Sequence, residues 1–207
     1  LPTTAPSTIV GAYILIRNLC EYNNLRGKKI FYLCHPIFLN NSLDQELTYN
    51  HFVKPFYKSA NKKYLTIEAL KELSSIPYLY ASQLPFIKAS DWSPSFDFKN
   101  QKGQNTIEIS NLNIKYIQKI KELASQEGFS FFLRSPLLHP KFKNLNLKKL
   151  LDQAKNNKIE SVFNDYLNNI FYIDSTLFLY DHHHFKTSIF KIYDEDELLK
   201  KLNINHM

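Results

Sequence analysis

A helix that leads into a continuously apolar strand occurs twice in the sequence, and this arrangement constrains the fold more than any other feature. In the first copy, apolar side chains recur at helical spacing through residues 8–23, and a turn leads to the apolar run 30–34. In the second copy, residues 111–126 have the same spacing, Gly128 can end the helix, and residues 129–133 form the next run. Strands that are apolar along their whole length are typical of a parallel sheet covered by helices on both faces. The sequence therefore predicts an α/β fold.

A third, weaker unit follows the first two. We expect a helix at residues 145–156 and a short strand around residues 170–173, and then helices at residues 185–193 and 195–202. Alternating helices and buried strands predict a three-layer, doubly wound parallel sheet with right-handed crossovers, as in flavodoxin-like folds. Ligands of such sheets bind beyond the carboxyl ends of the strands, so functional residues are expected there.

A long segment, residues 39–110, separates the first two units and is rich in aromatic residues, asparagine and serine. We expect it to be an insertion, with a helix at residues 66–73 and a loop at residues 90–105 that shapes a binding cleft. Trp92 in this loop has two open interpretations. Its ring can stack on a sugar, because aromatic faces suit the apolar faces of sugars, or it can pack the insertion onto the domain.

The composition favours one globular domain over residues 1–207. With 44% hydrophobic and 14% aromatic residues, the chain can bury a sizeable core. The most apolar early run is interrupted by Arg17, and no run approaches the ~18 apolar residues that span a bilayer. The net charge of +7 arises from lysines dispersed among acidic residues, which predicts solvated lysine faces and no nucleic-acid partner. Cys20 and Cys34 lack metal-type spacing and are expected to be small buried hydrophobes.

The strongest chemical signal is the segment from Tyr180 to Phe185, which follows the last expected strand. Asp181 lies three residues before His184, a spacing at which a carboxylate can accept a hydrogen bond from one nitrogen of the imidazole and so orient the ring. The other ring nitrogen can then take a proton from a serine hydroxyl. Two other interpretations remain open. The histidine run 182–184 can be a zinc, copper or nickel site, although adjacent side chains on an extended loop point in different directions. The segment can also be a histidine-rich surface turn.

Three blocks of sequence, in this order, resemble the SGNH hydrolase superfamily, specifically its envelope-polysaccharide O-acyltransferases and esterases. Residues 2–13 are similar to the threonine- and proline-containing helix start of these proteins. Residues 131–140, an apolar strand followed by Ser135-Pro136, resemble their penultimate strand and proline loop. Asp181 to His184 resembles their final Asp-x-x-His block. The resemblance implies a single SGNH-like α/β domain in which His184 is the general base and Asp181 orients it.

The nucleophile of this family belongs to a Gly-Asp-Ser-like block, which the resemblance puts upstream of Leu1. The chain opens without Met, and we expect it to be incomplete at its N-terminus. The only Gly-x-Ser match ends at Ser130, which opens an expected strand, whereas a nucleophile follows one. The family's oxyanion-hole asparagine corresponds to Asn40 or Asn41.

Two histidines outside the Asp-x-x-His block follow expected strands. His35 ends the first apolar run and His139 follows the second, so that each can line a cleft or serve the structure alone.

The resemblance implies a serine esterase or O-acyltransferase that acts on a cell-envelope glycan, with a glycan or acyl-ester substrate and no cofactor. It also implies a periplasmic or otherwise extracytoplasmic location, membrane anchoring through a preceding segment, and a membrane-bound acyl-donor partner. The alternative is a non-catalytic SGNH-like module that binds a glycan or a partner protein. The absence of a suitable serine from the sequence favours this alternative.

Overall fold

The computed structural model describes residues 9–40, 66–67, 70–71, 108–179, 185–186 and 188–201. Its described residues fall into two compact units, each made of separate stretches of the chain. The first unit draws on Leu1–Ile30, Ile37–Phe96 and Ile109–Phe131, and the second draws on Phe31–Pro36, Asp97–Glu108 and Phe132–Met207. Most of the expected insertion, including the loop at 90–105, lies outside the described residues.

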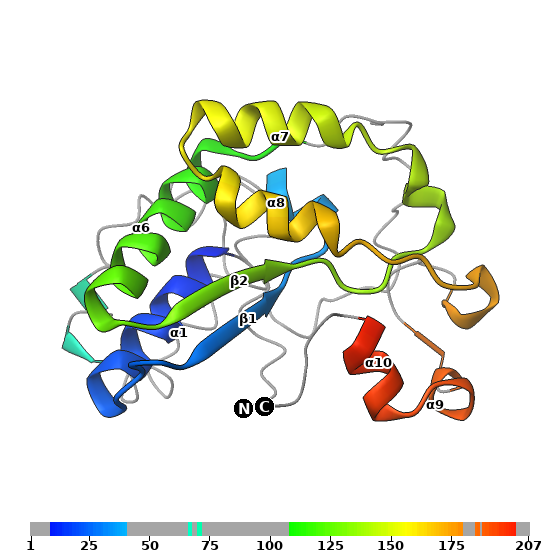
Figure 1. Cartoon of the computed structure of the whole chain (residues 1–207), viewed down its shortest axis with the longest axis horizontal. Helices are drawn as coiled ribbons and strands as arrows, with labels where there is room; N and C mark the ends of the chain where they lie inside the picture. The colour runs from blue at the N-terminus through cyan, green and yellow to red at the C-terminus, as the bar shows by residue number, and fades with distance from the viewer. Residues whose placement is uncertain are drawn as a thin grey trace, which may run out of the picture. The chain divides into compact units, whose positions relative to one another are not determined.

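A parallel pair of strands runs through both units. Strand β1 (Lys29–Leu33) pairs with β2 (Ser130–Arg134), and both are rich in the aromatic and branched residues that suit a buried sheet (Figure 1). The pairing extends to Cys34, whose N–H donates to the carbonyl of Arg134 at 2.8 Å. The mixed α/β architecture and both strands are thus as predicted, with boundaries shifted by one residue. Within the described residues the sheet has these two strands, and the complete doubly wound sheet stays a prediction.

In the first unit, the structure has both helices that the periodicities predicted, α1 (Ile9–Tyr22) and α6 (Asn111–Glu127). The two helices pack along each other (Figure 1). The two helices bury a face rich in isoleucine. Tyr13 meets Tyr116 edge to face with ring centroids 5.5 Å apart, and the Lys119 ammonium lies 5.5 and 5.4 Å from the two centroids. The contact between the helices therefore combines apolar packing with a cation above paired rings.

The start of α6 is tied to the 3-10 helix η1 (Pro36–Asn40), which follows β1. Ser110 caps α6 through its side chain, and its own N–H donates to the carbonyl of Leu39 at 2.9 Å. Asn113 is almost completely buried, and its amide donates to the carbonyls of Phe38 and Leu39 at 3.0 and 2.7 Å. These bonds fix the chain after β1 against the first turn of α6.

Both helix-to-strand turns of the first unit contain a glycine in the left-handed region. Gly27 and Gly128 have φ of 74°, and the N–H of Gly27 donates to the carbonyl of Gly128 at 2.8 Å. Gly128 is the predicted end of α6, where its N–H caps the carbonyl of Ala124. A Cβ on Gly128 would lie 3.3 Å from the Arg26 Cγ, whereas a Cβ on Gly27 would meet nothing within 4 Å.

We expect Gly27→Ala to lower the free energy of unfolding by about 1 kcal/mol, because alanine resists a left-handed backbone. Gly128→Ala should cost more, since Arg26 must also move away from the new methyl group. Urea unfolding of both variants measures the difference. Equal losses would show that Arg26 moves freely and that only the backbone conformation matters.

In the second unit, helix α7 (Leu147–Asn156) packs against α8 (Glu160–Asn168) (Figure 1). Helix α7 agrees with the expected helix at 145–156, but α8 was not predicted. It is short and is made largely of residues with modest helix propensity. Its buried Val162, Phe163 and Tyr166 stabilise it through tertiary packing instead.

The second unit contains a cluster of buried apolar side chains. Its buried members are Leu137, Ile173, Leu177, Phe178 and Ile189. The strand expected at 170–173 is reduced to an isolated parallel bridge between Leu138 and Tyr172. The helix expected at 185–193 was wrong at its start, because Phe185 pairs with Phe178 in an antiparallel bridge.

Three short helical elements belong to this part of the chain. They are the 3-10 helix η6 (Ser175–Leu177), α9 (Ile189–Ile192) and α10 (Glu195–Lys201). The last agrees with the helix expected at 195–202. Among the helices in the described ranges, none combines the length and apolarity needed to cross a membrane.

Candidate functional site

The carboxyl ends of β1 and β2 bring polar residues together in the second unit. Because the strands are parallel, Cys34-His35 and Arg134-Ser135 emerge at the same edge of the sheet, and all four residues are buried. Helix α8 adds Asp165 and Tyr166 to this edge. We call these six residues the strand-end cluster: Cys34, His35, Arg134, Ser135, Asp165 and Tyr166.

Tyr166 joins α8 to the end of β1. Its side chain is fully buried, and its hydroxyl donates to the carbonyl of Cys34 at 2.9 Å. Burial, followed by the neighbouring Cys34 thiol, raises the pKa of Tyr166 well above its usual range, and a side-chain hydrogen bond with Ser135 opposes the shift. The phenol therefore keeps its proton at neutral pH and serves as a hydrogen-bond donor.

The Cys34 thiol is unsuited to nucleophilic chemistry. Burial alone raises the pKa of Cys34 to about 12, so the reactive thiolate is negligible at neutral pH. Its Sγ lies 3.7 Å from the carbonyl oxygen of His35, a weak hydrogen bond. The prediction of a small buried hydrophobe is confirmed for Cys34, whereas Cys20 is only partly buried.

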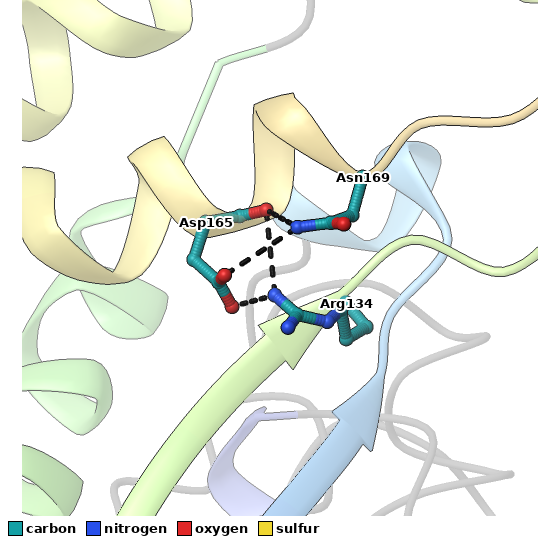
Figure 2. Close-up of polar contacts among 3 residues, drawn as sticks. All are labelled: Arg134, Asp165 and Asn169. Carbon is teal, nitrogen blue, oxygen red and sulfur yellow. Dashed lines mark hydrogen bonds and ion pairs between the residues drawn. The ribbon is translucent and has the colours of Figure 1, made fainter. Parts of the chain in front are cut away.

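Arg134 ends β2 and forms a buried ion pair with Asp165 of α8 (Figure 2). Its Nη1 contacts the Asp165 carboxylate and lies 3.5 Å from the Asp165 carbonyl oxygen. Asn169 donates to the same carbonyl at 2.6 Å and to the carboxylate at 3.4 Å. The guanidinium carbon also lies 5.7 and 5.5 Å from the ring centroids of Phe31 and Phe132. Burial lowers the pKa of Arg134, but a guanidinium stays protonated at any physiological pH.

His35 and Ser135 complete the edge. The His35 ring packs edge to face on Phe142, with centroids 4.8 Å apart. Ser135 donates its hydroxyl to the carbonyl of Pro136 at 2.8 Å and is almost fully buried. Ser130 opens β2, as expected, and therefore lies at the opposite end of the strand from the cluster.

Most of the other predicted site residues lie outside the described residues. These are Asp181, His184, Asn41 and Trp92. Asn40 is exposed at the end of η1 in the first unit, while His35 belongs to the second. His139 follows β2, caps the 3-10 helix η5 (Pro140–Asn144) through its Nδ1, and packs edge to face on Phe178 at 5.2 Å.

Metal binding has no candidate site in the part of the chain that the structure describes. No group of three His, Cys, Asp or Glu side chains gathers there. The histidine run 182–184 lies outside that part, so its metal-binding interpretation stays open.

Comparisons of the sequence with models of protein families, with characterised proteins and with solved structures found no match. The function of the strand-end cluster must therefore be inferred from its own residues.

Sequence reasoning missed Arg134, Asp165 and Tyr166. One signal was present for Arg134, a charged residue that directly ends an apolar strand, at the edge where ligands of parallel sheets bind. Asp165 and Tyr166 had no such signal, because the helix that carries them was not expected.

We expect Tyr166→Phe to lower the free energy of unfolding by about 1–3 kcal/mol, because it leaves the buried carbonyl of Cys34 without its donor. Tyr172→Phe is the matched control. The Tyr172 hydroxyl lies 3.4 Å from the carbonyl of Phe142 in a less buried position, so its loss should cost under about 1 kcal/mol. A control that destabilises as much as Tyr166→Phe would contradict the role of the Tyr166 bond.

Thiol titration with Ellman's reagent at pH 8 separates the two cysteines. Burial, and then the nearby Glu127 carboxylate, raises the pKa of the half-buried Cys20. One thiol of the native protein should therefore react slowly with the reagent. In a Cys20→Ser variant, the remaining thiol should not react until denaturant is added. Rapid reaction of Cys34 in the folded variant would contradict its burial and reopen a thiol-based chemistry.

Proposed function

We propose that the chain is the C-terminal part of an SGNH-type serine esterase or O-acyltransferase that acts on a cell-envelope glycan. Its complete domain is a three-layer doubly wound sheet, and a preceding segment of the polypeptide supplies the nucleophilic serine. His184 is the general base, and Asp181 orients its imidazole.

The observation that carries the proposal is that the residues on the two sides of this motif contact each other. Phe178 and Phe185 lie on either side of Asp181 and His184 in the sequence, form an antiparallel bridge, and have ring centroids 4.9 Å apart. The N–H of Lys186 adds a bond to the carbonyl of Leu177 at 2.8 Å. The two ends of the segment that carries the motif are therefore joined to each other.

The joined ends also contact the chain that follows β2. Phe178 shares an apolar cluster with Leu137, and the His139 ring packs on its ring at 5.2 Å. The residues resembling the family's proline loop and those flanking its Asp-x-x-His block thus pack together in one unit. The contact follows the carboxyl end of a parallel strand, and doubly wound folds bind their substrates beyond such strand ends, which supports the proposal.

The chemistry follows from general base catalysis. His184 takes the proton of the serine hydroxyl as its oxygen attacks the acyl carbonyl, and then returns that proton to the leaving group. Asp181 accepts from the other ring nitrogen and stabilises the imidazolium. Hydrolysis and transfer share these steps and differ in whether water or a sugar hydroxyl accepts the acyl group.

The second candidate is a non-catalytic module that binds a glycan or a partner protein. The positions of the two serines nearest the strands favour it, since Ser130 opens β2 and Ser135 is buried against Pro136. A nucleophile must lie exposed beyond the carboxyl end of a strand. Neither serine meets this requirement.

Ester hydrolysis by the protein expressed from its natural start codon distinguishes the two candidates. With p-nitrophenyl acetate, His184→Ala should lower kcat by about 10³-fold or more, and Asp181→Asn by a comparable factor. His182→Ala is the matched control and should leave kcat nearly unchanged, because the proposal gives His182 no part in proton transfer.

The pH dependence provides a second readout of the same role. The wild-type kcat/KM should rise with pH as the imidazole loses its proton, because only the neutral ring can accept the proton of the serine. Activity that survives His184→Ala would refute the assignment of the base. Absence of esterase activity in the long form would favour the binding module.

A further inference from the structure

We propose that Arg134 is a binding residue for a carboxylate, and that the strand-end cluster recognises the acid group of an acidic sugar. Only the identification of the ligand as a sugar rests on the proposed function. The recognition of the carboxylate itself is argued from the guanidinium and its surroundings.

Among the described residues, the guanidinium of Arg134 is only partly used. Its ion pair and its hydrogen bond to the Asp165 carbonyl both involve Nη1. Figure 2 draws these contacts to Asp165 from a single nitrogen of the guanidinium. Nε is buried and, among the described residues, has no hydrogen-bond partner. An unpaired buried donor of a charged group is unfavourable, which points to a ligand that completes it.

The unused donors have a specific geometry. Nε–H and the outward N–H of Nη2 lie parallel on one side of the guanidinium, and this fork matches the two oxygens of a carboxylate or a phosphate. Asp165 already offsets the single positive charge of Arg134, so the site has little excess charge to attract a dianion. This balance favours a carboxylate, a monoanion, over a phosphate.

The surroundings of the fork suit a ring-bearing ligand. Phe31 and Phe132 are stacked with centroids 5.0 Å apart, lie together on one side of the guanidinium, and are only half-buried. Aromatic faces of this kind pack against the apolar face of a sugar ring. The Asp165 side chain is 28% exposed, although Oδ2, the oxygen paired with Arg134, is buried. A uronic acid offers both the planar acid and the ring.

A purely structural ion pair predicts different behaviour. If Arg134 only joins β2 to α8, Asp165→Asn should destabilise the protein and leave its affinity for acids unchanged. If Arg134 binds a carboxylate, the same change removes the competing negative charge and should tighten binding about fivefold. The sign of the change in affinity therefore separates the two roles.

The experiment measures binding of glucuronate to the full 207-residue chain by NMR, following the Arg134 Nε–H resonance. We expect this resonance to shift with glucuronate and to stay unchanged with glucose, which lacks the acid. Arg134→Lys keeps the charge but lacks the fork, and should weaken glucuronate binding about tenfold or more. The wild-type spectrum needs no variant, so the test stands even if Arg134→Lys fails to fold.

Each remaining outcome overturns the proposal. A shift with inorganic phosphate but not with glucuronate would show that Arg134 binds a phosphate and not a carboxylate. No shift with either anion, or equal glucuronate affinity in Arg134→Lys, would leave Arg134 a structural residue. Because binding is measured without an ester substrate, failure here leaves the proposed esterase untouched, and absence of esterase activity leaves the binding result standing.

Discussion

The second unit depends on the parallel pairing of β1 with β2 and on the helix that holds both strand ends. The Cys34 N–H to Arg134 carbonyl bond of 2.8 Å sets the two carboxyl ends side by side. Two consecutive residues of α8 each hold one strand end. Tyr166 donates to the carbonyl of Cys34 after β1, and Asp165 pairs with the guanidinium of Arg134 at the end of β2. Without α8, a buried carbonyl and a buried cation would lose their partners together, and each loss alone costs about 1–3 kcal/mol or more. These polar contacts add to the buried side chains of Val162, Phe163 and Tyr166 in holding the short helix in place.

Burial determines the protonation of this edge and therefore its chemistry. Desolvation disfavours the anionic forms of Cys34 and Tyr166, whose pKa values are both raised, so both groups stay neutral. The charges of Arg134 and Asp165 offset each other. An edge of this kind supplies hydrogen-bond donors and one cation, but no thiolate or phenolate to remove a proton. Its chemistry is suited to holding an anionic group.

The elements that could be predicted from the sequence are those whose signal is local. Helices α1 and α6 and their strands follow from apolar spacing, and Gly128 marks the end of a helix by its conformational freedom alone. The elements that were missed depend on distant contacts. Helix α8 owes its stability to buried Val162, Phe163 and Tyr166, and Phe185 pairs with Phe178 instead of beginning a helix. The same limit applies to the site, because the pairing of Arg134 with Asp165 joins segments that no spacing rule connects.

The two functional proposals assign separate tasks to one continuous stretch of chain. Arg134 ends β2, and the residues that follow it, Leu137 and His139, contact Phe178 at the base of the segment that carries Asp181 and His184. A carboxylate bound by Arg134 would therefore be positioned by the same backbone that supports the proposed base. Positioning is worth a large part of a rate enhancement, because small displacements of a substrate from its base lose much of the advantage of proximity. In the proposed enzyme, the strand would bind the acid group, and a segment whose ends pack on the following loop would transfer the proton. The acid group and the reacting ester would then keep a fixed position relative to each other.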